Sequence, residues 1–159
     1  MSRFVVGILS EVAVTDSEIS YSVIIACYNE EKAIGQTIES LFDPSRGNSN
    51  FEVIVVNDGS TDTTCDILRR LKSQYPNVTV VEHAQNQGYG ASLKTGIRKA
   101  RSQFIAITDA DGTYPNERLP ELVAACSDYD MVVGARTAEG AGLSKLREFP
   151  KSFLRRWMM

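Results

Sequence analysis

Five short apolar runs, rich in valine and isoleucine, recur along the chain, and none of them shows a polar face. Strands that are buried on both faces have such continuous runs, whereas strands with one solvent-facing side alternate between apolar and polar residues. The pattern therefore predicts a mostly parallel sheet covered on both sides. Its strands are expected at Tyr21 to Cys27, Glu52 to Val56, Val78 to Val81, Phe104 to Thr108 and Met131 to Ala135.

Apolar residues at three- and four-residue spacing follow several of these runs and predict helices with one buried face. The spaced positions are Ile34, Ile38, Leu41 and Phe42, then Ile67, Leu68, Leu71 and Tyr75, and then Leu119, Leu122, Val123 and Cys126. Asn29 is expected to cap the first helix, and Ser60 or Thr61 the second. Strands that alternate with helices predict an α/β fold, in which ligands bind at the carboxyl ends of the strands.

The length of 159 residues and the 43% hydrophobic content suffice for one domain with a sizeable core. We expect this domain over residues 20–159, ending as a domain truncated at its C-terminal end would, and leave the leader, residues 1–19, unassigned. The net charge of −3 argues against a nucleic-acid partner, because such proteins usually carry a dense basic face.

The three cysteines, Cys27, Cys65 and Cys126, lack the spacing of a zinc site and lie in or beside apolar runs. We expect buried, reduced thiols, which favour a cytoplasmic location. No stretch approaches the roughly 18 consecutive apolar residues that a membrane-spanning helix needs. The chain is therefore expected in the cytoplasm, with contact at the cytoplasmic face of a membrane left open.

The fourth apolar run ends in two carboxylates two positions apart, Asp109 and Asp111. In extended backbone, residues i and i+2 point the same way, so both side chains are expected to face one cation. Carboxylate oxygens suit Mg²⁺ or Mn²⁺, and such an ion neutralises charge on a departing diphosphate. A solvated acidic turn is the plainer interpretation.

Polar residues also follow the other runs. Asp58 ends the second run and is a candidate acceptor for a base N–H. Tyr28 and Glu30 follow the first run and suit a nucleotide, although taken alone they favour a helix cap with acidic residues in its first turn. Gly88 belongs to a glycine pair that leads into a helix, where a backbone approaches a ligand closely. His83, the one histidine, is interpreted as structural.

In this order and spacing, the four segments resemble the nucleotide-binding domain of family 2 inverting glycosyltransferases of the GT-A fold. The resemblance is to the dolichyl-phosphate mannosyltransferase branch and runs from about Tyr21 to the end of the chain. It implies a Rossmann-like sandwich and a nucleotide-sugar donor carrying GDP or UDP. The implied nucleotide positions are Ala26, Tyr28, Glu30, Asp58, Gly88, Asp109, Ala110 and Asp111. The implied metal ligands for Mg²⁺ or Mn²⁺ are Asp109, Asp111 and Thr113, where Thr113 replaces a residue that is often glutamine.

The resemblance also implies catalytic roles for Arg136 and Arg147, which would contact phosphates, beside Asp109 and Asp111. It implies a polyprenyl phosphate acceptor, since the acceptor is already an anionic nucleophile and needs no base. The segment 149–159 places aromatic residues four positions apart with cations between, which suits either a lipid surface or packing on protein.

Three alternatives remain open at this point. One is a family 2 transferase that acts on a polysaccharide or another hydroxyl acceptor. Another is a module that binds the donor without transferring it. The third is a haloacid-dehalogenase-type phosphatase with Asp109 as nucleophile, although the downstream acidic pair of that class has no counterpart after Glu148.

Overall fold

A computed structural model describes residues 3–7, 20–43 and 50–134 of the chain. Its strands are β1 (Arg3–Gly7), β2 (Tyr21–Cys27), β3 (Phe51–Asn57), β4 (Val78–Glu82), β5 (Phe104–Asp109) and β6 (Met131–Gly134). Its α-helices are α1 (Ile34–Leu41), α2 (Thr64–Gln74), α3 (Tyr89–Lys99) and α4 (Leu119–Ala125), and a short 3₁₀ helix (Asn116–Arg118) precedes α4.

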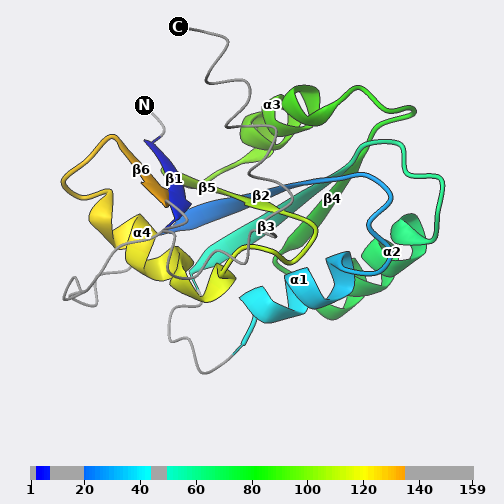
Figure 1. Ribbon diagram of the computed structural model, residues 1–159, viewed down its shortest axis with the longest axis horizontal. Coiled ribbons are helices and arrows are strands. Elements are labelled where there is room, and N and C mark those ends of the chain that lie inside the picture. The colour runs from blue at the N-terminus through cyan, green and yellow to red at the C-terminus, as the bar shows by residue number, and fades with distance from the viewer. Residues whose placement is uncertain (1–2, 8–19, 44–49, 135–159) are drawn as a thin grey trace, which may run out of the picture.

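The strands form one sheet in the order β4-β3-β2-β5-β1-β6, and neighbouring strands run parallel (Figure 1). From β2 the chain adds β3 and β4 on one side and then crosses to β5 on the other. The strand order therefore reverses between β2 and β5. In open α/β sheets, the carboxyl ends of the two strands at such a point border the ligand crevice.

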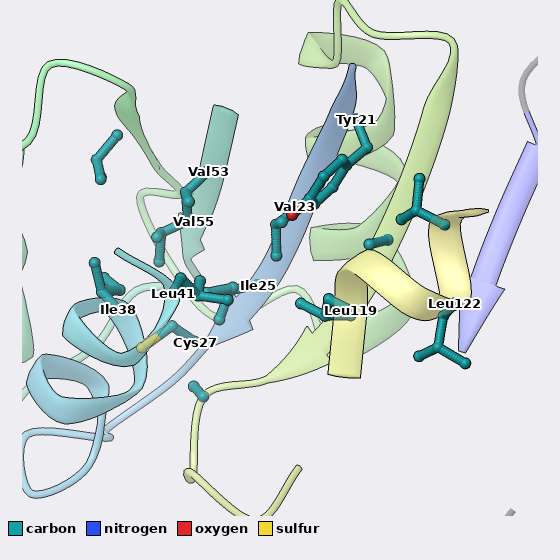
Figure 2. Packing of buried hydrophobic residues seen from close by; sticks show 14 of the residues in the cluster. Tyr21, Val23, Ile25, Cys27, Ile38, Leu41, Val53, Val55, Leu119 and Leu122 are labelled. Carbon is teal, nitrogen blue, oxygen red and sulfur yellow. The ribbon is translucent and has the colours of Figure 1, made fainter. Parts of the chain in front are cut away.

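Helices cover both faces of the sheet, as Figure 1 shows, with α3 on one side and α1, α2 and α4 on the other. The larger core joins these three helices to the sheet through side chains such as Val23, Ile25, Ile38 and Leu122 (Figure 2). The smaller core lies under α3, around Ile24, Ile54 and Ile105. Alternate residues of one strand thus enter different cores, which explains why the strands read as continuous apolar runs.

The five predicted strands are confirmed: β2 has the predicted ends, and the ends of the other four differ by at most one residue. Two details differ from the expectation. β6 lies at an edge, where Met131 and Val133 are exposed, so this apolar run is not buried on both sides. In addition, Arg3–Gly7 lies within the expected leader but forms β1 between β5 and β6, so the sheet begins before residue 20.

The predicted helix caps are wrong. The residues before α1 and α2 are Ala33 and Thr63, and neither side chain makes a capping hydrogen bond. Asn29 instead has a positive φ of 54° and accepts a hydrogen bond from the backbone N–H of Thr61 at 2.8 Å. The loops after β2 and β3 use these polar side chains to bind each other instead of capping the helices. Backbone N–H groups of each loop donate to side chains of the other.

Candidate functional site

A cavity of about 600 Å³ opens at the carboxyl ends of β2, β3 and β5. Its volume lies within the usual range of small-molecule sites. It is lined by Ala26, Cys27, Tyr28, Glu30, Asp58, Asn86, Gly88, Tyr89, Ser92, Asp109, Ala110 and Asp111. The sheet register places Ala26 directly beside Asp109, so the cavity lies where the strand order reverses.

All eight positions expected to contact a nucleotide line this cavity, although they come from four separate segments of the chain. Four further lining residues were not among the expected positions: Cys27, Asn86, Tyr89 and Ser92. Tyr28 and Tyr89 are 44% and 53% exposed, so two aromatic rings are accessible at the cavity wall. The sequence feature that could have indicated Tyr89 is its position between Gly88 and Gly90, at the start of α3.

Asp109 and Asp111 both line the cavity, but their convergence does not come from extended backbone. β5 ends at Asp109, and the chain turns at once, with Gly112 at a positive φ of 70°. Oδ1 of Asp111 accepts a hydrogen bond from the backbone N–H of Thr113 at 2.9 Å. Oδ1 of Asp109 accepts a longer one, at 3.4 Å, from the hydroxyl of Tyr89. A turn, rather than strand alternation, therefore brings the two carboxylates together.

Buried polar contacts from α1 and from the 3₁₀ helix hold the turn that carries Asp109 and Asp111. The hydroxyl of Thr37 in α1 donates to the carbonyl oxygen of Ala110 at 3.0 Å. Thr108 in β5 is bonded to the side chain of Asn116 at 2.6 Å, and Asn116 in turn donates to Ser40 of α1. These residues are not part of any sequence motif, so sequence reasoning had no means of finding them. They fix the acidic turn against α1 and the 3₁₀ helix.

Among the described residues, the carboxylates on the acidic side of the cavity face one another without a paired cation. Burial raises the pKa of Glu30, and the charges of Asp111, Asp62 and Asp109 raise it further. Within the described residues, no ion pair partners Glu30, Asp109 or Asp111. Hard carboxylate oxygens in such a field fit a divalent cation of the Mg²⁺ or Mn²⁺ type.

No group of three or more His, Cys, Asp or Glu side chains in the described part of the chain is arranged to hold a metal ion. Asp109 and Asp111 are the two carboxylates of the acidic turn that line the cavity, and a divalent cation held there would need further oxygen ligands. Thr113, the third expected ligand, is exposed and does not line the cavity, and its backbone N–H is used by Asp111.

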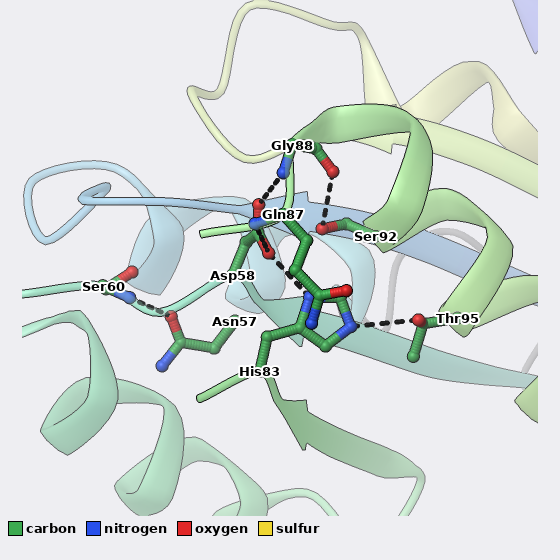
Figure 3. A network of polar contacts seen from close by, with 8 residues as sticks. All are labelled: Asn57, Asp58, Ser60, His83, Gln87, Gly88, Ser92 and Thr95. Carbon is green, nitrogen blue, oxygen red and sulfur yellow. Dashed lines mark hydrogen bonds and ion pairs between the residues drawn. The ribbon is translucent and has the colours of Figure 1, made fainter. Parts of the chain in front are cut away.

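Asp58 lies at the end of β3 in the cavity wall, and its carboxylate is held on several sides (Figure 3). Oδ1 accepts hydrogen bonds from Nδ1 of His83 at 2.6 Å and from the backbone N–H of Gln87 at 2.9 Å. Oδ2 accepts the backbone N–H of Gly88 at 2.8 Å. Burial raises the pKa of Asp58, but these hydrogen bonds together outweigh burial and lower it below its usual value. Asp58 is thus ionised and anchors the loop that begins α3.

Gly59 permits this loop to approach closely. Its φ is 71°, and a Cβ atom there would lie only 2.6 Å from the backbone carbon of Gln85 and 2.7 Å from the nitrogen of Asn86. Neither backbone atom is able to move aside as a flexible side chain would. The glycine after Asp58 is therefore required for the contact between the turn after β3 and the loop before α3.

Cys27 lines the cavity, but its chemistry is that of a buried thiol. Burial, together with the charges of Glu30 and Asp62, raises its pKa to about 12. The thiol is protonated at neutral pH and does not supply a nucleophile. Cys126 is also buried, whereas Cys65 is partly exposed and donates to a carboxylate oxygen of Glu82 at 3.3 Å, so the expectation of three buried thiols is wrong for Cys65.

Three expectations lie outside the described residues: the phosphate contacts of Arg136 and Arg147, and the amphipathic segment 149–159. In the described ranges, no helix combines the length and the apolar character that crossing a membrane requires.

A parallel α/β sheet with an acidic cavity at its reversal point fits the GT-A fold, which its neighbours among solved structures share. The chain belongs to glycosyl transferase family 2, whose family model matches residues 22–156. Membership of this family does not fit the phosphatase alternative.

Among curated relatives, the chain is 31% identical over 149 residues to a dolichyl-phosphate β-glucosyltransferase of Trichomonas vaginalis, a match that covers 84% of this chain and 44% of the relative. It is 35% identical over 99 residues to a poly(ribitol-phosphate) β-glucosyltransferase of Bacillus spizizenii, covering 62% of this chain and 16% of the relative. A solved mannosyltransferase of Pyrobaculum calidifontis, in complex with GDP-Man and Mn²⁺, is similar with a TM-score of 0.61 and 29% identity. That match covers 72% of this chain and 34% of the solved one. The chain thus spans less than half the length of each of these proteins.

Proposed function

We propose that this protein transfers a sugar from a nucleoside diphosphate donor to a polyprenyl phosphate of the dolichyl type, with inversion and with the help of Mg²⁺ or Mn²⁺. The donor occupies the cavity at the carboxyl ends of β2, β3 and β5. Tyr28, Glu30 and Asp58 face its nucleoside, and Asp109 and Asp111 face its diphosphate through the metal. Arg136 and Arg147 supply the phosphate contacts that the described residues lack.

One observation carries the proposal: the acidic turn after β5 shares a cavity with the loops after β2 and β3 and before α3. Asp109 and Asp111 alone would suit a solvated turn. In company with an exposed aromatic ring at Tyr28 and an ionised, loop-anchoring Asp58, they suit a ligand with a flat base at one end and a diphosphate at the other.

The chemistry follows from the charges. A divalent cation held by Asp109 and Asp111 supplies neutralisation of the charge that develops on the departing nucleoside diphosphate. The bond from the anomeric carbon to the diphosphate oxygen breaks, and its electron pair leaves with the diphosphate. An oxygen of the acceptor phosphate forms the new bond from the opposite face. This oxygen is already anionic at neutral pH, so the protein needs to position it and does not need to deprotonate it.

Similarity to a dolichyl-phosphate sugar transferase over 84% of the chain supports the lipid phosphate acceptor. An acceptor with a polyprenyl tail places the reaction at a membrane surface, and the segment 149–159 is our candidate for that contact. The second candidate is transfer to a hydroxyl of a polymer, which the similarity to a poly(ribitol-phosphate) glucosyltransferase favours. That chemistry requires a general base, whereas transfer to a phosphate does not.

The donor half of the proposal is tested by thermal unfolding with GDP-, UDP- and CDP-sugars, each with and without Mn²⁺. A ligand that binds only the folded state raises the unfolding temperature. We expect one nucleotide class to stabilise the protein, and only when Mn²⁺ is present. The absence of stabilisation by all three classes would overturn the proposal.

The acceptor half is tested with the donor that stabilises the protein, labelled in its sugar. Polyprenyl phosphate in detergent and poly(ribitol phosphate) are offered in parallel. We expect label in the lipid extract. Label in the polymer alone would establish the second candidate, and donor binding without label in either product would indicate a binding module without transferase activity.

A further inference from the structure

His83 lies next to the cavity without lining it, and the proposed chemistry gives it no part. It follows β4, and its side chain is 9% exposed. Nδ1 lies 2.6 Å from Oδ1 of Asp58, and Nε2 lies 3.0 Å from the hydroxyl of Thr95 in α3 (Figure 3). Both ring nitrogens are therefore engaged, and the ring joins the end of β3 to the middle of α3.

The hydrogen-bond types assign the contact at Nδ1. An ionised carboxylate only accepts hydrogen bonds, so Nδ1 carries a hydrogen and donates it to Asp58. Nε2 is paired with the hydroxyl of Thr95, a group that both donates and accepts hydrogen bonds. The ring is thus held in one orientation by its two partners, as outer partners usually hold a functional group.

The contact continues into the cavity wall. The carboxylate that receives Nδ1–H also receives the backbone N–H groups of Gln87 and Gly88, at 2.9 and 2.8 Å. Gly88 lines the cavity and has a φ of 90°, a conformation that favours glycine. The position of this turn therefore depends on the direction of the Asp58 carboxylate, and His83 sets that direction.

We propose that His83 is a positioning residue of the donor site: held by Thr95, it orients Asp58, and Asp58 fixes the Gln87–Gly88 turn against the bound nucleotide. This inference rests on the proposed nucleotide-sugar function. It assigns to His83 an effect on donor affinity through Nδ1, beyond its contribution to the stability of the fold.

Two amide variants separate the two ring nitrogens. In His83→Asn the side-chain nitrogen falls near the place of Nδ1 and continues to donate to Asp58. In His83→Gln it falls near the place of Nε2, so the bond to Asp58 is lost while Thr95 keeps a partner.

The readout is the dissociation constant of GDP, UDP and CDP, each with Mn²⁺, by calorimetry. For the nucleotide that binds, we expect affinity within about 3-fold of the parent for His83→Asn and a loss of about 10-fold or more for His83→Gln, because hydrogen bonds to charged groups are the stronger ones.

Ser22→Ala is the matched control. Ser22 donates to Glu52 at 2.7 Å at the opposite end of β2, so its loss lowers stability without touching the cavity. We expect its nucleotide affinity to equal that of the parent. Should His83→Gln not fold, Thr95→Val removes the hydroxyl that holds Nε2 at nearly constant volume, and we expect it to weaken binding by about 3-fold.

The outcomes are separable. Parental affinity in both His83→Gln and Thr95→Val would overturn the inference, as would an equal loss in His83→Asn and His83→Gln, because the Nδ1 bond would then not be the cause. If the parent protein binds none of the three nucleotides, it is the proposed function that fails.

Discussion

Glu52 at the amino end of the sheet and the acidic turn after β5 at the carboxyl end hold their carboxylates in opposite ways. At the amino end, Glu52 begins the buried part of β3 and is 8% exposed. Oε1 accepts the hydroxyl of Ser22 and the backbone N–H of Arg101, and Oε2 accepts two guanidinium N–H groups of Arg101, at 2.7 to 3.0 Å. At the carboxyl end, Asp109 and Asp111 line a cavity and have no ion pair within the described residues.

The difference teaches that the environment of an acidic residue, and not its type, separates a structural role from a functional one. The carboxylate of Glu52 is buried and receives four donors, two of them from the guanidinium of Arg101, so it has no acceptor position left for a ligand. Neighbouring carboxylates without a cation repel one another and gain from any cation that arrives. The following predictions test this contrast, from the largest effect to the smallest.

The largest effect is expected at the open end. Replacing both Asp109 and Asp111 by asparagine removes the charge that would hold the proposed metal while the side chains keep their shape. We expect Mn²⁺-dependent nucleotide binding to weaken by about 100-fold or more, since even partners outside the metal shell contribute about 10–100-fold. Calorimetry measures the binding, and urea unfolding is expected to show no loss of stability. Parental Mn²⁺ dependence in the double variant would contradict the site.

At the closed end, Glu52→Gln is expected to act on stability instead. The amide cannot receive all four donors and loses the attraction of Arg101, so the free energy of unfolding falls by about 1–3 kcal/mol. Urea denaturation measures it. Asp66→Asn is the matched control, because its 2.6 Å pair with Arg69 is 66–76% exposed and is worth less than about 1 kcal/mol. Nucleotide affinity is expected to be unchanged in both variants. A loss of affinity in Glu52→Gln would contradict the purely structural role of Glu52.

The stability difference between the parent and Glu52→Gln is expected to depend on pH, and the pKa shift of Glu52 gives its sign. Burial raises the pKa of Glu52, but the hydrogen bonds from Arg101 and Ser22 and the charge of Arg101 outweigh burial, so the pKa lies below its usual value. The stability that Glu52 contributes is then present above the unfolded value of about 4.3 and is lost as the pH falls through the lowered, folded-state pKa. Unfolding of parent and Glu52→Gln, compared from pH 7 to pH 3, is expected to converge at the acid end. A gap that widens toward acid would contradict the assignment.

The smallest effect is expected at Glu30, with the opposite sign. Burial and the charges of Asp111, Asp62 and Asp109 raise its pKa, so the ionised side chain destabilises the metal-free protein at neutral pH. Glu30→Gln is therefore expected to raise the unfolding temperature slightly, by an amount below about 1 kcal/mol in free energy. The gain is expected to shrink as the pH falls into the ordinary carboxyl range, where the parent becomes protonated. A lower unfolding temperature at pH 7 would indicate that an attraction has been missed.

The sheet and most of the helices could be predicted from the sequence because burial on both faces leaves continuous apolar runs that are visible without any knowledge of contacts. β1 was missed because Arg3–Gly7 is short and isolated, and its pairing with residues about a hundred positions away leaves no local signal. The caps were mispredicted at Asn29 for a related reason. Local spacing favours a cap, but a loop from elsewhere in the chain offers the side chain a better partner.

The site was predictable to the extent that function places polar residues directly after apolar strands. That rule finds Asp58, Asp109 and Asp111 without a structure. It does not find the supports, such as Thr37 under the acidic turn or Thr95 behind His83, because threonine in a helix has no distinguishing pattern. The third metal ligand, Thr113, was implied by the resemblance instead of by this rule, and Thr113 is not among the residues that line the cavity.

The loop after β2 and the loop after β3 are joined by more than the contact of Asn29. The N–H groups of Asn29, Glu30 and Glu31 donate to side chains in the range 60–64, and two N–H groups from that range donate back. Surface loops normally exchange their amide hydrogens with solvent quickly. Here, opening one loop requires breaking its hydrogen bonds to the other loop. These five amides are therefore expected to exchange slowly and together, so that one edge of the cavity is preformed as a rigid rim before any ligand arrives.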